Sequence, residues 1–172
     1  MKVLIADDDA LSRKVLYDAL LEWGYDITVA HNGNEAWTIL ENADRPNIAV
    51  LDWMMPGMDG VDICRKLRTL NTANYVYVIL LTARSKREDL IKGLESGADD
   101  YIIKPFNHEE LKLRLKIGRR IIELEQNILH LASTDYLTGL LNRRAFIERM
   151  TKEMNRCQRE KSQLGIIIVD ID

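Results

Sequence analysis

Short apolar runs alternate with amphipathic stretches along the first part of the chain. The apolar runs have the length of strands and are bounded by turn-forming residues. Between them, apolar residues recur at the spacing of one helix face, as Leu16 and Leu20 do. This pattern predicts strands over 2–6, 27–30, 47–52, 75–82 and 100–103, and helices over 10–23, 35–42, 61–70, 85–97 and from about 108 onward.

Strands that alternate with helices predict a single parallel sheet with right-handed crossovers. Helices then cover both faces of the sheet, so the most apolar strands, including the first, are expected inside it. The predicted fold class is therefore α/β, with a doubly wound, five-stranded parallel sheet. In such a sheet all strands end at one edge, and open α/β folds place their chemistry there.

Polar side chains follow or end four of the predicted strands. Asp7 and Asp8 follow the first strand, Asp52 ends the third, Thr82 ends the fourth and Lys104 follows the fifth. Clustered carboxylates repel one another, and a cation that prefers oxygen ligands, above all Mg²⁺, relieves that repulsion. A carboxylate beside a metal ion, an ammonium and a hydroxyl is well placed to attack phosphorus. Each residue alone also fits a structural role, such as capping a turn.

Together these residues resemble the receiver domain of two-component response regulators, over residues 1–120. The resemblance implies a flavodoxin-like strand order of 2-1-3-4-5 and a cis peptide bond before Pro105. It rests on four short segments: Asp7–Asp9, Leu51–Gly60, Leu81–Ala83 and Lys104–Phe106.

The resemblance also implies a phosphoacceptor and a set of metal ligands. Asp52 would accept a phosphoryl group from a sensor histidine kinase or a phosphotransfer protein. Asp8 and Asp52 would bind Mg²⁺ directly, together with the backbone carbonyl of Met54, while Asp7 would act through water.

Three further residues acquire roles by the same resemblance. Thr82 and Lys104 would contact the phosphoryl oxygens. Tyr101 stands three residues before Lys104, where the family places its switch aromatic. Phosphorylation would draw Thr82 inward and allow Tyr101 to rotate, which is a population shift between two states. The alternative for Tyr101 is a core aromatic with its hydroxyl at the surface.

The last receiver helix is expected to continue as a stalk over residues 108–132. Its flanks are charged and its apolar residues recur at steps of three and four, which is typical of a coiled coil. We therefore expect a homodimer through residues 113–131, although the stripe could instead pack back on its own chain. The stripe consists of Leu113, Ile117, Ile121, Leu124, Ile128 and Leu131.

Residues 133–172 form a separate predicted segment, with a turn, a helix over 142–160 and an apolar strand over 164–172. The runs Asp135–Arg144 and Val169–Asp172 resemble the start of a GGDEF (diguanylate cyclase) domain. By that resemblance the Asp170 carboxylate and the Ile171 backbone carbonyl would be ligands of a second magnesium site.

The sequence stops at Asp172, before the Gly-Gly-(Asp/Glu)-Glu-Phe hairpin of that family. We therefore expect the cyclase output to be truncated and inactive in this chain, whereas a longer parent would make cyclic di-GMP from two GTP. One strand and one helix cannot build a core, so residues after about 133 are expected to pack only opportunistically.

Composition narrows the partners and the compartment. The net charge of −3 gives no electrostatic footprint for nucleic acid, and no apolar run has membrane-spanning length. The two cysteines, Cys64 and Cys157, are isolated, and the N-terminus enters a strand directly. These features predict a cytoplasmic protein that binds neither nucleic acid nor membrane.

Two alternatives remain open from the residues. A haloacid-dehalogenase-like phosphatase also uses an aspartyl phosphate, but its nucleophile follows the first strand, here Asp7, in a pattern that Leu11 does not complete. The other alternative is a receiver-type docking module that is never phosphorylated, against which the intact acidic set argues.

Overall fold

The computed structural model describes residues 1–70, 75–83 and 87–169, with only the backbone described over 87–90. These residues belong to two compact units, Met1–Leu124 and Glu125–Asp172. The first unit contains a five-stranded parallel sheet in the order β2-β1-β3-β4-β5, which confirms the predicted fold class and strand order. β1 is an interior strand, as predicted, and β3 is the middle one.

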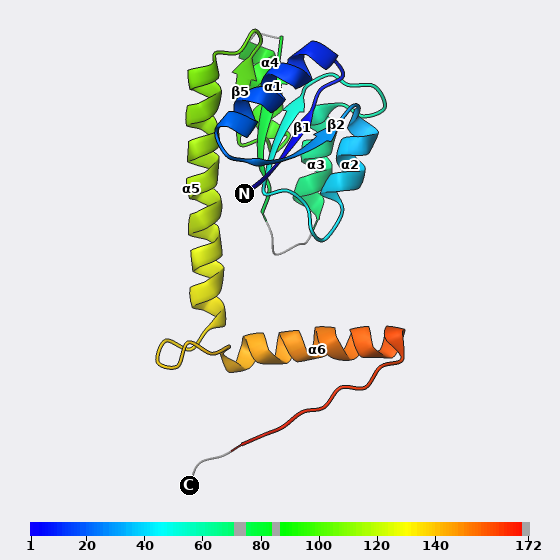
Figure 1. Ribbon diagram of the computed structural model, residues 1–172, viewed down its shortest axis with the longest axis vertical. Coiled ribbons are helices and arrows are strands. Elements are labelled where there is room, and N and C mark those ends of the chain that lie inside the picture. The colour runs from blue at the N-terminus through cyan, green and yellow to red at the C-terminus, as the bar shows by residue number, and fades with distance from the viewer. Residues whose placement is uncertain (71–74, 84–86, 170–172) are drawn as a thin grey trace. The chain divides into compact units, whose positions relative to one another are not determined.

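The strands and helices alternate along this unit, as predicted (Figure 1). The strands are β1 (Lys2–Ala6), β2 (Asp26–Ala30), β3 (Ile48–Asp52), β4 (Tyr77–Thr82) and β5 (Asp100–Ile103). The helices are α1 (Ala10–Glu22), α2 (Gly33–Leu40), α3 (Gly60–Thr69), α4 (Arg87–Glu95) and α5 (His108–Ser133), the last of which is continuous beyond residue 124.

The core has two layers because successive strand side chains point to opposite faces of the sheet. Leu4 and Ala6 of β1 belong to one apolar cluster with side chains of α2 and α3. Val3 and Ile5 belong to the other, with side chains of α1 and α5. Every one of these β1 side chains is fully buried. The unbroken apolar runs in the sequence therefore reflect a sheet that is covered on both faces.

Capping residues set the helix boundaries more closely than apolar spacing does. The Asn32 side chain accepts a hydrogen bond from the Glu35 N–H, so α2 begins at Gly33, two residues before its predicted start. Only glycine fits at position 33, because a Cβ there would lie 1.8 Å from the carbonyl oxygen of Met58.

β4 begins at Tyr77, two residues after its predicted start, because the residues before it bind an arginine and an aspartate. Arg68 of α3 donates to the Val76 carbonyl oxygen at 3.0 Å and to Asp99 Oδ2 at 2.7 Å. Asp99 also accepts hydrogen bonds from the Tyr75 hydroxyl and from the Val78 N–H. These contacts tie α3 to the loop before β5.

The second unit is held by local hydrogen bonds, and none of residues 125–169 is buried. Thr134 and Leu141 form an antiparallel bridge, and the Asp135 carboxylate accepts from the Thr138 N–H and hydroxyl. α6 (Arg143–Glu160) begins one residue after its predicted start. Asn142 caps this helix by accepting a hydrogen bond from the Ala145 N–H, and its side chain also donates to the Ala132 carbonyl oxygen.

The predicted strand at the end of this unit is not formed over residues 164–169. Ile167 and Ile168 are about nine-tenths exposed there. The prediction was wrong because a β-strand needs a partner for its backbone groups, and an apolar run alone supplies none. The expectation that this region packs loosely agrees with its exposure.

Candidate functional site

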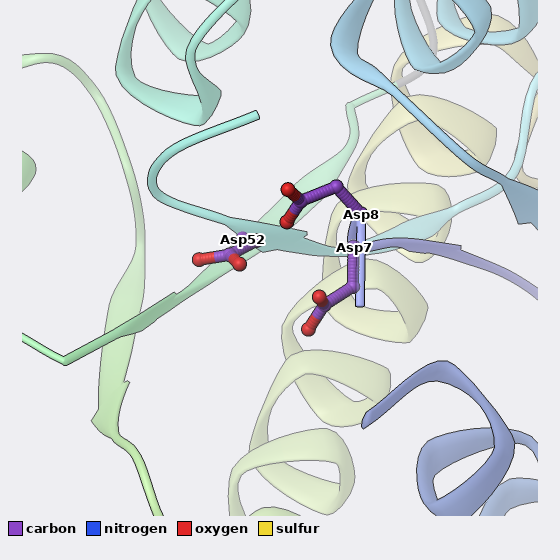
Figure 2. A group of neighbouring side chains, drawn as sticks. All are labelled: Asp7, Asp8 and Asp52. Carbon is purple, nitrogen blue, oxygen red and sulfur yellow. The ribbon is translucent and has the colours of Figure 1, made fainter. Parts of the chain in front are cut away.

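Three carboxylates meet at the carboxyl edge of the sheet. β1 and β3 are adjacent and in register, with Ala6 opposite Leu51, so Asp7, Asp8 and Asp52 follow at the same level. One oxygen of each carboxylate lies within 4.8 Å of an oxygen of the other two. Figure 2 shows the three side chains gathered at these two strand ends. The convergence predicted from the parallel sheet is therefore observed.

Lys104 joins two of these carboxylates. Its Nζ lies 2.7 Å from Asp7 Oδ2 and 2.7 Å from Asp52 Oδ2. Lys104 follows β5, and its N–H donates to the Thr82 carbonyl oxygen at 2.7 Å, which fixes where the side chain starts. The next peptide bond, Lys104–Pro105, is cis, as predicted.

Burial and charge act in opposite directions on this pair. Burial raises the pKa of Asp52, and the nearby Asp7 adds to the effect, although the hydrogen bond and charge of Lys104 oppose it. Burial also opposes the charge of Lys104, but its contacts with Asp52 and Asp7 outweigh it and raise the Lys104 pKa. One ammonium facing several carboxylates stays charged, whereas the carboxylates share a single partner.

The donor set fits a hard divalent cation. Asp7 is buried, Asp52 is partly exposed and Asp8 is exposed, so ligands come from the protein on one side and from water on the other. Oxygen ligands combined with open water positions are what Mg²⁺ prefers. Three carboxylates and one lysine also leave excess negative charge, which a divalent cation would balance.

Comparison with known proteins assigns the first unit. The family model described as "Response regulator receiver domain" matches residues 3–116, which is more than half of the chain. The chain belongs to the response regulator receiver family.

Individual relatives agree with this assignment. The chain is 43% identical over 127 residues to a probable transcriptional regulator, ycf27, of Porphyridium aerugineum, covering 73% of this chain and 51% of that one. It is 37% identical over 162 residues to the response regulator MprA of Mycobacterium avium, covering 94% and 67%. The chain thus spans from about half to two-thirds of these curated relatives.

Solved structures show the same receiver fold. The receiver domain of Francisella response regulator 1452 is 40% identical with a TM-score of 0.64, over 69% of this chain and 96% of that one. The chemotaxis response regulator CheY4 of Vibrio cholerae is 29% identical with a TM-score of 0.63, over 68% and 97%.

The second unit has a partial match of its own. The description "Diguanylate cyclase, GGDEF domain" matches residues 132–172. The predicted ligands Asp170 and Ile171 lie outside the described residues. None of the described helices is long and apolar enough to cross a membrane.

The remaining predicted residues of the receiver lie at the end of β4, in β5 and just after β3. Thr82 is fully buried at the end of β4, next to β3. Met54 is exposed, and its N–H donates to the Asp52 carboxylate. Tyr101 of β5 is partly buried and packs against the core cluster that contains Leu80. These positions are compatible with the roles expected from the sequence.

Sequence reasoning missed what holds Asp7 in the receiver. The Ser12 hydroxyl donates to Asp7 Oδ2 at 2.6 Å, and Arg13 Nη1 donates to the Asp7 carbonyl oxygen at 2.7 Å. Asp9 caps α1 by accepting from the Ser12 N–H. The spacing of Asp9 and Ser12, which is that of an N-cap and its third helical residue, is the signal that could have placed Ser12 above the strand end.

Proposed function

We propose that Asp52 accepts a phosphoryl group from the phosphohistidine of a sensor histidine kinase or phosphotransfer protein. The observation that carries this proposal is the Lys104 ammonium, held at 2.7 Å from Asp52 within a cluster of three carboxylates. Lysine and a nearby divalent cation are the groups that stabilise charge on a transferring phosphoryl. Family membership favours this function over the dehalogenase-like alternative. The intact acidic cluster favours it over the receiver-type docking module.

The chemistry is a simple displacement at phosphorus. An oxygen of Asp52 forms a bond to phosphorus while the bond from phosphorus to the histidine nitrogen breaks, and the histidine leaves as the other product. Bound Mg²⁺, held by Asp8, Asp52 and the Met54 carbonyl with Asp7 through water, would supply charge neutralisation for the phosphoryl oxygens. Lys104 then pairs with those phosphoryl oxygens in place of the Asp7 carboxylate.

The proposed response of the receiver passes through Thr82 and Tyr101. Thr82 ends the strand between β3 and β5, so its hydroxyl is at hand for a phosphoryl oxygen at the same edge. Tyr101 is on the neighbouring strand, with its partner Leu80 two residues before Thr82. Movement of Thr82 toward the phosphoryl group would leave space for Tyr101 to turn inward and change the surface around β5.

The proposed output is a diguanylate cyclase that begins at about residue 133, after a receiver over 1–120 and a stalk over 108–132. The partial GGDEF match supports this output. The parent protein would act in the cytoplasm, where GTP and the histidine kinase's catalytic domain are found, and residues 133–172 would carry only the start of the cyclase. A transcriptional output is the second candidate, because a relative 39% identical over 135 residues is the DNA-binding response regulator MtrA of Mycobacterium leprae.

The stalk is proposed to pair with a second copy of the chain. One face of α5 is buried against the receiver core through Leu111, Leu115, Gly118 and Ile122. The second apolar stripe of α5 is left exposed. The exposed fractions in that stripe range from 40% at Ile121 to 75% at Leu131. Burying such a stripe against its own copy is the usual reason for a heptad pattern.

Intact-protein mass measurement after incubation with acetyl phosphate and Mg²⁺ tests the phosphoacceptor. The chain should gain the mass of one phosphoryl group, and Asp52→Asn should gain none. Asp62→Asn is the matched control, because Asp62 lies on the surface of α3 in an exposed pair with Arg65. Equal phosphorylation of Asp52→Asn and the control would contradict the proposal.

Solution mass with and without a beryllium fluoride phosphoryl mimic tests the stalk. A rise from monomer to dimer with the mimic would tie Asp52 to pairing through residues 113–131. Ile121→Glu should abolish the dimer and leave phosphorylation intact, since Ile121 lies on the exposed face of α5. A dimer that persists in this variant would place the interface elsewhere.

A further inference from the structure

Three donors hold the carboxylate of Asp7, and one of the two side-chain donors, the Ser12 hydroxyl, has no role in the proposed function. The Ser12 hydroxyl donates to Asp7 Oδ2 at 2.6 Å. The Lys104 ammonium donates to the same oxygen at 2.7 Å. The Asp9 N–H donates to the other oxygen, Oδ1, at 2.9 Å. Ser12 and Lys104 therefore share one oxygen of a carboxylate that is fully buried.

The backbone around Ser12 fixes its hydroxyl relative to this oxygen. Ser12 is in the first turn of α1, and its N–H donates to the capping Asp9 Oδ2 at 2.7 Å. Arg13, the next residue, donates through Nη1 to the Asp7 carbonyl oxygen at 2.7 Å. The start of α1 is thus tied to the end of β1 by both main-chain and side-chain contacts.

The sharing matters because Lys104 must change partners during the proposed reaction. It now bridges Asp7 and Asp52. When Asp52 forms its bond to phosphorus, the charge moves from that carboxylate to the phosphoryl oxygens. Lys104 can move to the phosphoryl oxygens only if its ion pair with Asp7 is weak enough to break. A buried carboxylate oxygen that was left without a donor would oppose that move.

We propose that Ser12 is a positioning residue for phosphoryl transfer, which occupies Asp7 Oδ2 so that Lys104 can move to the phosphoryl group. The inference rests on the proposed function of Asp52. The hydroxyl partly compensates the charge of Oδ2, which weakens the pull of Asp7 on the ammonium. It also keeps that oxygen hydrogen-bonded after Lys104 has left, so the movement strands no buried acceptor.

The variant Ser12→Ala removes this hydroxyl with little else changed. The Ser12 N–H would still be capped by Asp9, and alanine is the better helix former, so α1 should keep its stability. The matched control is Thr38→Ala in α2, whose exposed hydroxyl donates to the Asn34 carbonyl oxygen within the same helix.

The experiment measures the rate of phosphoryl gain from acetyl phosphate by intact mass, on the full 172-residue chain. In this reaction the phosphorus–oxygen bond to acetate breaks as the bond to Asp52 forms, and acetate leaves. At saturating Mg²⁺, Ser12→Ala should slow the maximal rate about tenfold. The Mg²⁺ concentration for half-maximal rate and the Tm should stay near those of the parent chain. Ser12→Thr should restore the rate, and Thr38→Ala should not alter it.

A second background separates positioning from a merely structural role. In Lys104→Met, which removes the ammonium, adding Ser12→Ala should change the residual rate little, because Ser12 acts through Lys104. Equal losses in both backgrounds, or a parent rate in Ser12→Ala alone, would overturn the inference while Asp52 remained the phosphoacceptor. If the unsubstituted 172-residue chain gains no phosphoryl group, the proposed function itself is overturned, and with it this role of Ser12.

Discussion

The two units of the chain use apolar side chains in opposite ways. In Met1–Leu124 the strand residues fill two buried clusters, one on each face of the sheet. In Glu125–Asp172 none of the described residues is buried, although the segment contains α6 and an apolar run over 164–169. Ile79 is fully buried in β4, whereas Ile168 is 91% exposed.

The difference teaches that apolar patterning specifies an element only where partners exist to cover it. β4 lies between β3 and β5, and both of its faces meet helices, so its pattern is satisfied. Residues 164–169 have no partner strand in the described part of the chain, and the side chains of Ile167 and Ile168 stay about nine-tenths exposed. What order the second unit has comes from short-range hydrogen bonds around Asp135 and Asn142.

The largest expected contrast is between two isoleucines. Ile79→Ala should lower the free energy of unfolding by about 4 kcal/mol, because it leaves a cavity in a close-packed core. Ile168→Ala should change it by less than about 0.5 kcal/mol, as for other exposed positions. Urea unfolding of both variants measures the difference. A substantial loss in Ile168→Ala would mean that the tail has a packed partner after all.

A smaller contrast separates two arginines. Arg68→Ala should cost about 3 kcal/mol, because Asp99 and the Val76 carbonyl oxygen would lose a donor in a largely buried setting. Arg144→Ala removes only an exposed pair with Glu148 on α6 and should cost at most about 0.5 kcal/mol. Similar losses in the two variants, again by urea unfolding, would show that the second unit depends on tertiary contacts too.

Two glycines sharpen the same comparison. A Cβ at Gly118 of α5 would lie 2.4 Å from the Tyr77 ring, which is buried, whereas a Cβ at Gly165 would meet nothing within 4 Å. Gly118→Ala should therefore destabilise the first unit by about 2 kcal/mol, since the clash outweighs the helix propensity gained. Gly165→Ala should have no measurable effect on the Tm. A more stable Gly118→Ala would contradict the close packing of α5 on β4.

The smallest expected effect is a pH-dependent gain at the acidic edge. The folded-state pKa of Asp52 is raised above its ordinary value of 3.8, mainly by burial. Its contribution to stability is therefore present at pH values below 3.8 and is lost as the pH rises through the raised pKa. Without Mg²⁺, Asp52→Asn should be more stable than the parent at pH 7, by at most about 1 kcal/mol. The gain should shrink as the pH falls toward 4, and a pH-independent gain would assign it to packing.

Sequence reasoning reached the fold and the cluster of acidic residues because both follow from period and position. Strand length, alternation with helices and a shared carboxyl edge are enough to bring Asp7, Asp8, Asp52 and Lys104 together. The resemblance supplied the strand order and the cis bond, which no periodicity predicts.

The rest depends on side-chain contacts that no local pattern encodes. Gly118 is the place where α5 approaches the Tyr77 ring, and helical spacing alone does not predict that contact. Arg68 and Asp99 are 31 residues apart, so neither predicts the other. Residues 164–169 failed as a strand because a strand is defined by its neighbours, and apolar spacing cannot supply them.

Mapping the phosphoryl group to a residue tests the central claim most directly. After incubation with acetyl phosphate and Mg²⁺, borohydride reduction converts an aspartyl phosphate to homoserine, which peptide mass spectrometry can locate. The account predicts a single converted residue, Asp52. Conversion at Asp7, as a dehalogenase-like phosphatase would give, or no conversion anywhere, would contradict it.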